Sequence, residues 1–283
     1  MRKATQADIP AMRAFLSAHI ETSMFLLSNL LDHGVDETQA PHGTTFYLTE
    51  DSGALTGVFG VTNDGFLLCQ SPQIDDGAAQ DFAEALSGRS IQGMTGEARQ
   101  VAVALQALPV PDDAWRVDRV EPLLTCDLDG VTAAGEVRVA RDADVDMLVS
   151  WFADYMAETG FGGEGAALEK QATERSRAVV GSPKTRLLIE NDVPVAMAGI
   201  NARVGAVVQV GGVFVPQGLR GQGRGGAVTR SLLAEQKDHG ATRAILFAAS
   251  PAAEASYKRI GFTPCGGYQI ALLSAPLTLA VLS

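Results

Sequence analysis

A glycine cluster in the last quarter of the chain is the segment best suited to chemistry. The six positions from Gly221 to Gly226 include four glycines. They follow an apolar run that ends at Val215 and precede an amphipathic helical pattern, so they mark a turn between a strand and a helix. Glycine lets the backbone approach a ligand closely, and the first N–H groups of a helix have no partners within it. Such a turn binds phosphate groups.

Other glycine-rich turns fit this segment less well. A purely structural connection would leave four glycines in six positions unexplained, because each glycine loses much backbone entropy on folding. The spacing Gly221-x-Gly223-x-x-Gly226 also fits a dinucleotide-binding turn. However, the next predicted strand, residues 242–250, carries no Asp or Glu to hold a ribose. A nucleotide-triphosphate loop would need Lys followed by Ser or Thr after the glycines, and the sequence has neither there.

The turn also resembles a motif of a known family. The pattern Arg220-x-x-Gly223-x-Gly225 is similar to the R/Q-x-x-G-x-G/A motif with which the GNAT superfamily of N-acetyltransferases binds pyrophosphate. We call residues 220–226 the phosphate turn.

A second pattern follows at the distance that this family shows. Residues 250–262 read Ser-Pro-Ala-Ala-Glu-Ala-Ser-Tyr-Lys-Arg-Ile-Gly-Phe and resemble the family pattern N-x-x-A-x-x-x-Y-x-x-x-G-F. The resemblance covers about residues 136–275. Ser250 stands where the family commonly has Asn, which implies an altered hydrogen bond to the pantetheine arm of the cosubstrate.

The resemblance implies an acetyl-CoA-dependent N-acetyltransferase that moves an acetyl group to a primary amine by direct attack in a ternary complex. This reaction needs a positioned neutral amine, a donor for the developing oxyanion and a proton for the leaving thiolate. The resemblance assigns the Val215 N–H to the thioester oxygen and Tyr257 to the thiolate. Because a phenol (pKa ~10) is a weaker acid than a thiol (~8.5), Tyr257 would act by hydrogen bonding as much as by full donation.

The contacts expected for acetyl-CoA lie on both sides of the turn. They are Phe214, Val215, Arg220, Gly221, Gln222, Gly223, Arg224, Gly225, Gly226, Ser250 and Tyr257. The two arginines are expected to add positive charge beside the backbone amides.

The general base is less clear in the sequence. Relatives frequently carry Glu on the central strand, where this chain offers only Gln209. Glu158, Glu164 and Glu190 are candidates, and deprotonation through ordered water fits equally well. By resemblance, the loop from Glu158 to Glu169 lines the acceptor site, and its acidic, Gly-rich sequence favours a cationic amine and a mobile lid.

The elements around these motifs predict two domains. A linker rich in small residues, Asp127 to Gly135, separates expected domains at 1–127 and 136–283. Both domains begin with an Arg followed by an Asp at the same spacing, Arg2 and Asp8 in the first domain and Arg138 and Asp144 in the second. Each Asp is expected to cap a helix. A second echo, of two hairpins, follows in the same order and favours a duplicated domain over chance.

The predicted fold class is α/β of the mixed α+β type. By resemblance, each domain is GNAT-like, with a mixed, mostly antiparallel twisted sheet flanked by helices. In the N-terminal copy, the segment Ser71 to Gly77 stands where the phosphate turn should be. It has one glycine, no arginine and two adjacent aspartates. This copy is therefore expected to be degenerate, to bind no cosubstrate, and to shape the acceptor cleft or mediate assembly as a homodimer.

Composition limits the other functions. A net charge of −11 argues against a nucleic-acid partner, because binding a phosphate backbone needs a basic surface. Three widely spaced cysteines argue against disulfides and structural zinc, and no metal is expected. No apolar run is long enough for a membrane span, so we expect a cytoplasmic protein whose partner is a small-molecule or peptide amine. The main alternative function is a non-catalytic acyl-CoA-binding sensor or scaffold, and an NAD-binding protein is a more distant one.

Overall fold

The computed structural model describes residues 1–280 and divides the chain into two compact units. Unit 1 contains Met1–Glu121 and the segment that begins at Gly266, and unit 2 contains Pro122–Cys265. The expected division at 1–127 and 136–283 therefore differs from the observed one in two strands. The last strand of the chain lies mainly in unit 1, and the strand before the predicted linker enters unit 2.

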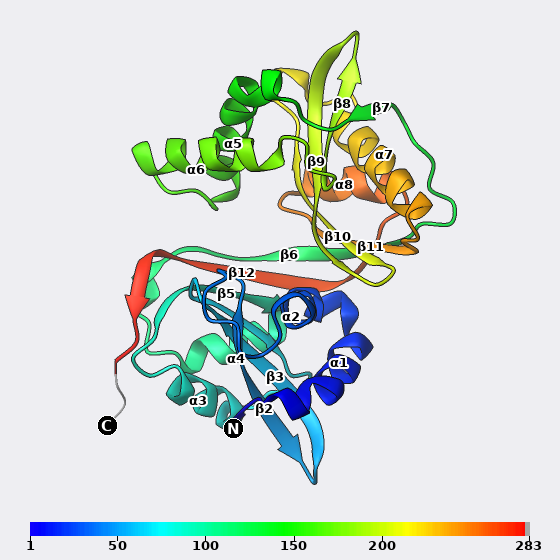
Figure 1. The fold of residues 1–283 in the computed structure, drawn as a ribbon. Helices are drawn as coiled ribbons and strands as arrows, with labels where there is room; N and C mark the ends of the chain where they lie inside the picture. Colours follow the sequence, from blue (N-terminus) through cyan, green and yellow to red (C-terminus); the bar gives the residue numbers. More distant parts are fainter. Residues whose placement is uncertain (281–283) are drawn as a thin grey trace. The chain divides into compact units, whose positions relative to one another are not determined.

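Unit 2 contains the elements that surround the phosphate turn (Figure 1). They are β7 (Glu136–Arg138), α5 (Val145–Thr159), α6 (Ala166–Val179), β8 (Thr185–Glu190), β9 (Val193–Val204), β10 (Val207–Phe214), α7 (Arg224–Asp238), β11 (Arg243–Phe247) and α8 (Pro251–Arg259). The end of β6 (Trp115–Asp127) completes the sheet, and β12 (Thr263–Thr278) begins in this unit. These elements follow the predicted pattern closely, because the helices are amphipathic and the strands are apolar runs bounded by turns.

The sheet of unit 2 has the strand order β6-β11-β10-β9-β8-β7. Only β10 and β11 are parallel among these neighbours, and each other pair is antiparallel. Helices α5 and α6 pack on one face around Trp151 and Phe214, while α7 and α8 pack on the other around Val228 and Tyr257. The predicted mixed, mostly antiparallel sheet flanked by helices is confirmed.

Unit 1 repeats this order of elements. It contains β1 (Arg2–Lys3), α1 (Ile9–Ala18), α2 (Ile20–His33), β2 (Thr44–Asp51), β3 (Ala54–Thr62), β4 (Phe66–Gln70), α3 (Asp76–Ala85), β5 (Ser90–Glu97), α4 (Ala98–Ala107), most of β6 and most of β12. The strand order is β1-β2-β3-β4-β5-β12, and only β4 and β5 are parallel neighbours. In each unit the parallel pair is the pair joined by a crossover helix.

The Arg and Asp that recur at the same spacing near the start of both units form the same ion pair in each. Arg2 donates to both carboxylate oxygens of Asp8 at 2.9 and 2.7 Å, and Arg138 does the same to Asp144 at 2.6 and 2.9 Å. The arginine hydrogen bonds hold the pKa of both carboxyl groups below the ordinary value. Neither Asp makes the helix-capping hydrogen bond that was expected, because its oxygens face the arginine and an upstream backbone N–H.

The predicted linker, residues 127–135, packs against α7. Ser231 accepts from the Ala134 N–H at 3.0 Å and donates to the Gly135 carbonyl at 2.9 Å. Arg230 donates to the Thr132 hydroxyl at 2.7 Å, so this arginine anchors the linker. The linker expected from composition is therefore a fixed part of unit 2.

Candidate functional site

Strand β10 leaves its parallel neighbour before it ends. It pairs with β11 from Val207 to Val210, and from Gly211 to Phe214 it pairs with β9 alone. The register shifts between Gly211 and Phe214, where Gly212 has a φ of +61°, so the two glycines lie in a β-bulge. A bulge bends a strand away from its partner and leaves backbone groups unpaired. The side of β10 that faces β11 is therefore open beyond Val210.

The backbone at the open end offers a donor. The Val215 N–H makes no hydrogen bond within the described residues. Pro216 follows and has no N–H, so the strand cannot continue its ladder. A free N–H at the tip of a parted strand can polarise a carbonyl oxygen, which is the role that the sequence resemblance assigns to Val215.

The phosphate turn has the geometry of an anion cradle. Gly221 and Gly223 have φ values of +79° and +77°, a conformation that side chains other than glycine rarely adopt. Gly223 is the N-cap of α7, and the first backbone hydrogen bond of the helix runs from Ala227 to Gly223 at 2.9 Å. The N–H groups of Arg224, Gly225 and Gly226 therefore precede the first intrahelical bond and are available to an anion.

The last two glycines of the turn allow close packing. A Cβ on Gly225 would lie 3.6 Å from the Val215 side chain, and one on Gly226 would lie 3.2 Å from Ile260. Glycine at these positions lets the start of α7 approach the end of β10 and the end of α8 closely. The cradle and Val215 are therefore neighbours.

Both arginines of the turn are paired with carboxylates. Arg220 donates to both oxygens of Glu158 at 2.7 and 2.8 Å, and Arg224 donates to Glu190 at 2.5 to 3.0 Å. The expectation that the arginines add net positive charge here needs correction, because each charge is balanced. The backbone amides and the helix dipole then provide the remaining attraction for an anion.

These ion pairs also bear on the general base. The Arg224 hydrogen bonds hold the pKa of Glu190 below its ordinary value, which makes this carboxylate a poor base. Glu158 is occupied by Arg220. Gln209 is buried in the paired part of β10, where its amide N donates to the Val210 carbonyl at 2.8 Å, and its side-chain oxygen has no partner within the described residues. It lies in the part of β10 that still pairs with β11.

Tyr257 and Ser250 lie on α8 in different environments. Tyr257 is buried in the core between α7, α8 and the sheet, with its ring centroid 6.0 Å from that of Phe262. Ser250 is the exposed N-cap of α8, and its hydroxyl accepts from the Ala253 N–H at 3.2 Å. The hydroxyl can still donate to a ligand.

Comparison with known proteins finds a family model that matches this region. Residues 159–271 match the model described as an acetyltransferase (GNAT) domain. The resemblance predicted from the phosphate turn is therefore confirmed, and no curated protein matches the chain.

Solved structures extend the likeness to nearly the whole chain. A GNAT-family acetyltransferase from Colwellia psychrerythraea is 15% identical with a TM-score of 0.53, and the match covers 96% of this chain and 98% of that one. A GCN5-related N-acetyltransferase from Sphaerobacter thermophilus is 17% identical with a TM-score of 0.57, covering 99% and 96%. A tandem GNAT protein from the clavulanic acid biosynthesis pathway is 13% identical with a TM-score of 0.52, covering 98% of both chains. At these low sequence identities, the structural matches show a shared fold.

The corresponding region of unit 1 is closed. Strand β4 stays paired with β5 up to Cys69, one residue before it ends. The first N–H after β4, that of Ser71, donates to the buried side-chain oxygen of Gln100 at 2.6 Å. Asp75 caps α3 by accepting from the Ala78 N–H at 2.8 Å. Protein groups therefore occupy N–H groups whose counterparts in unit 2 have no partner within the described residues.

A surface cavity of about 580 Å³ lies at the start of α3 and is lined by residues that include Glu50, Asp75 and Asp81. Arg2 and the Met1 ammonium also line it, and they pair with Glu50 at 2.6 Å and with Asp81 at 2.7 Å. The Asp75 carboxylate caps α3 and so stands where an anion would meet the start of this helix.

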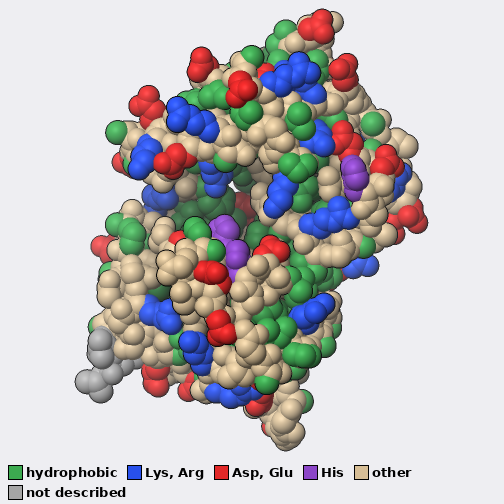
Figure 2. All heavy atoms as spheres, in the orientation of Figure 1, with side chains coloured by type: hydrophobic (Ala, Val, Ile, Leu, Met, Phe, Trp, Pro, Cys, Tyr) green, Lys and Arg blue, Asp and Glu red, His purple; other side chains and the backbone are tan. Residues whose placement is uncertain are grey.

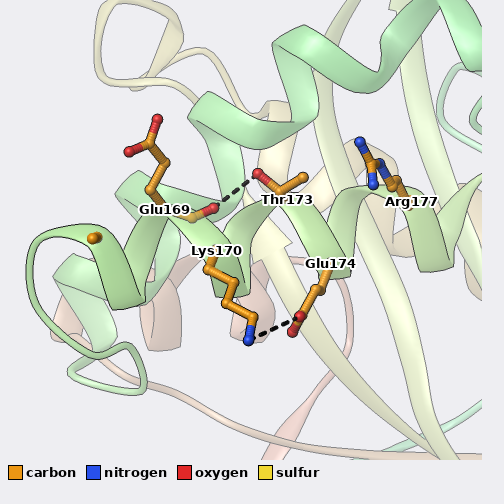
Figure 3. Close-up of a pocket in the computed structure, with 6 residues that line it drawn as sticks. Glu169, Lys170, Thr173, Glu174 and Arg177 are labelled. Carbon is orange, nitrogen blue, oxygen red and sulfur yellow. Dashed lines mark hydrogen bonds and ion pairs between the residues drawn. The ribbon is translucent and has the colours of Figure 1, made fainter.

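A second cavity, of about 410 Å³, lies along the outer side of α6 (Figure 3). The side chains there project from a single helix, with Lys170 3.9 Å from Glu174 and the Thr173 hydroxyl bonded to the Glu169 carbonyl at 2.9 Å. Figure 2 shows acidic and basic side chains interspersed on the visible face. The α6 cavity contains no residue of the phosphate turn and has the character of a solvated helix surface.

Residues 1–280 contain no group of three or more His, Cys, Asp or Glu placed to hold a metal ion. None of the helices in this part of the chain combines the length and the apolar character that crossing a membrane requires.

Sequence reasoning missed the partners of the arginines and the role of Gln100. Glu158 lies 62 positions from Arg220, and Glu190 lies 34 positions from Arg224. Their charges were visible, but only the fold brings them together. Gln100 gave a weaker signal, as a polar residue on the apolar face of a predicted amphipathic helix.

Proposed function

We propose that this protein is an acetyl-CoA-dependent N-acetyltransferase that transfers the acetyl group to a primary amine by direct attack in a ternary complex. The observation that carries the proposal is the pairing of a parted β10 end with a glycine cradle at the start of α7. Acetyl-CoA would supply the reactive thioester. Its diphosphate would be held by the backbone N–H groups of the phosphate turn, from Gly221 to Gly226.

Residues at the end of β10 would orient the acyl group. The Val215 N–H would donate to the thioester oxygen and stabilise the negative charge that develops on it. Phe214 would support this segment from the other face, because its ring packs against Trp151 at a centroid distance of 6.1 Å. The bulge glycines differ in their surroundings, because the Asn201 side chain fills the space beside Gly211, whereas a Cβ on Gly212 would meet nothing within 4 Å.

Tyr257 would assist the leaving group. Its phenol would hydrogen-bond the departing thiolate and share or donate a proton to it. Ser250 would donate its hydroxyl to the pantetheine arm while its oxygen caps α8. The amine would lose its proton to ordered water, because Arg224 holds the pKa of Glu190 low and β10 carries no titratable side chain.

We further propose that unit 1 is a diverged copy of the GNAT domain that binds no acyl-CoA. The repeated order of elements and the duplicated Arg–Asp pair support a common origin. The closed end of β4 and the carboxylates around α3 support the loss of binding. Its role would be to shape the acceptor site or to mediate assembly.

One observation favours an acyl-CoA-binding sensor as a second candidate function. Strand β10 carries no titratable side chain, so it offers no general base of its own. Both candidates predict binding of CoA, and they differ in turnover. Acetyl-CoA is incubated with a panel of primary amines, and released thiol is followed with a thiol-reactive chromophore. The enzyme predicts amine-dependent thiol release, whereas the sensor predicts CoA binding and no release with any amine.

A further inference from the structure

Arg220 connects the phosphate turn to α5. Its guanidinium donates to both oxygens of Glu158 and, through Nε, to the Val215 carbonyl at 2.8 Å. The group also lies 5.6 Å from the centre of the Phe214 ring. One side chain therefore joins the end of α5 to the residue whose N–H is proposed to hold the acyl oxygen.

Arg220 belongs to the phosphate turn and comes three residues before Gly223, the N-cap of α7. Val215 packs against the first turn of α7, where a Cβ on Gly225 would lie 3.6 Å from its side chain. A charge bonded to the Val215 carbonyl is thus beside the helix N-terminus that attracts anions. A diphosphate bound there would compete with the Glu158 carboxylate for the same guanidinium.

The Glu158 pair is the more exchangeable of the two ion pairs at the turn. The side chains of Arg220 and Glu158 are 43% and 50% exposed, and exposed ion pairs contribute little stability. Each arginine is also bonded to one backbone carbonyl, but Arg224 is only 12% exposed and is therefore less accessible to a ligand. A diphosphate therefore meets less resistance at Arg220.

Glu158 lies in the last turn of α5, at the negative end of the helix dipole. Its carboxylate is unfavourable there without a cation, so Arg220 compensates it in the free protein. Loss of Arg220 to a ligand leaves this carboxylate without that cation. The presence of Glu158 thus weakens diphosphate binding in two ways, by occupying the arginine and by losing its own counter-charge.

We propose that Glu158 is an autoinhibitory competitor, which holds Arg220 in the free protein and gives it up to the diphosphate of acyl-CoA. The inference rests on the proposed function, because it requires that CoA binds at the phosphate turn. Removal of the carboxylate is then expected to strengthen binding, which is an unusual outcome for a substitution beside a ligand site.

The test is isothermal titration of the full-length protein with CoA. Glu158→Gln removes the competitor and is expected to tighten CoA binding about two- to fivefold, the range that corresponds to an exposed ion pair. Glu174→Gln makes the same charge change on α6, away from Arg220, and is expected to leave the affinity unchanged. Arg220→Gln removes the shared cation and is expected to weaken binding. Thermal melts confirm that each variant is folded.

The outcomes separate the two proposals. If the unmodified protein does not bind CoA, the proposed function fails and this inference fails with it. If the unmodified protein binds CoA but Glu158→Gln binds no more tightly, the inference alone is overturned. Equal tightening in Glu174→Gln would show a general charge effect and overturn it as well, as would an unchanged affinity in Arg220→Gln.

Discussion

The two units follow the same order of elements but end their central strands differently. In unit 2, β10 parts from β11 after Val210, and nine residues, 215–223, lead to α7. In unit 1, β4 stays paired with β5 to Cys69, and five residues, 71–75, lead to α3. A shorter connection leaves no room for a glycine cradle. The candidate site of unit 2 and the corresponding region of unit 1 therefore differ at the end of the central strand and in the connection that follows it.

The comparison extends to single groups. The N–H that follows β10, at Val215, is free within the described residues, whereas the N–H that follows β4, at Ser71, is bonded to Gln100. The seventh residue of α8 is Tyr257, and the seventh residue of α4 is the buried Ala104. The common frame, marked by the Arg–Asp pair, is retained in both units. The two units thus share the frame and differ at the end of the central strand and at these single groups.

The largest predicted effect is on turnover. Tyr257→Phe is expected to lower kcat for acetyl transfer about 100-fold, the lower range for loss of a general acid, and to change the KM for acetyl-CoA little. The matched control is Tyr47→Phe in unit 1, whose hydroxyl bonds the Ala85 carbonyl at 3.2 Å and has no proposed catalytic part. Thiol-release kinetics measure both. An unchanged kcat in folded Tyr257→Phe would remove Tyr257 from the mechanism.

The next effect is on cosubstrate binding. Gly223→Val forces a β-branched residue into a conformation with φ of +77°, and is expected to weaken CoA binding by at least about tenfold. Gly77→Val, in the first turn of α3, is the matched change in unit 1 and should leave CoA binding unaltered. Titration calorimetry compares the two. Equal losses would mean that the units do not differ as described here.

A smaller effect is expected on the stability of unit 1. Gln100→Leu leaves the Ser71 N–H without its buried acceptor and is expected to destabilise the unit by about 1–3 kcal/mol. Gln80→Leu, at an exposed position of α3, should change stability by less than about 0.5 kcal/mol. Urea unfolding is followed by Trp115 fluorescence in a Trp151→Phe background, since Trp115 belongs to unit 1. Thiol release by unit 2 should remain normal, and a loss of turnover would contradict the division of roles.

The smallest effect concerns the duplicated ion pair and its pH dependence. Asp144→Asn is expected to destabilise unit 2 by about 1 kcal/mol at neutral pH, and Asp8→Asn should destabilise unit 1 by less, because Arg2 is more exposed than Arg138. The folded pKa of Asp144 lies below its ordinary value of 3.8, so its contribution is present above that value and is lost as pH falls through the folded pKa. Unfolding curves between about pH 7 and pH 2 measure this. A difference that stays constant throughout would exclude the ion pair as its cause.

The elements of unit 2 could be predicted because their signals are local. Glycines at 221–226 marked the start of α7, and the apolar run that ends at Val215 marked the strand before it. The pairing of β12 with β5, and that of the end of β6 with β11, could not be predicted. Nothing in the composition of β6 or β12 indicates which neighbour each strand pairs with, and this is decided by contacts between distant segments.

The candidate site was likewise predicted only in part. The backbone cradle followed from glycine types and spacing, whereas the charge state of the turn did not. Arg220 and Arg224 looked like free cations because their partners, Glu158 and Glu190, come from other elements of the fold. The expected N-cap role of Asp144 gave way to Arg138 for a similar reason, since a charged donor binds a carboxylate more strongly than a neutral N–H does.

The central claim is that the chain has one acyl-CoA site and that it lies in unit 2. The stoichiometry of CoA binding, measured by titration calorimetry on the full-length protein and on Gly223→Val, tests it most directly. The account predicts one CoA per chain in the unmodified protein and loss of that binding event in the variant. Two CoA molecules per chain, or one that binds equally well to Gly223→Val, would contradict it.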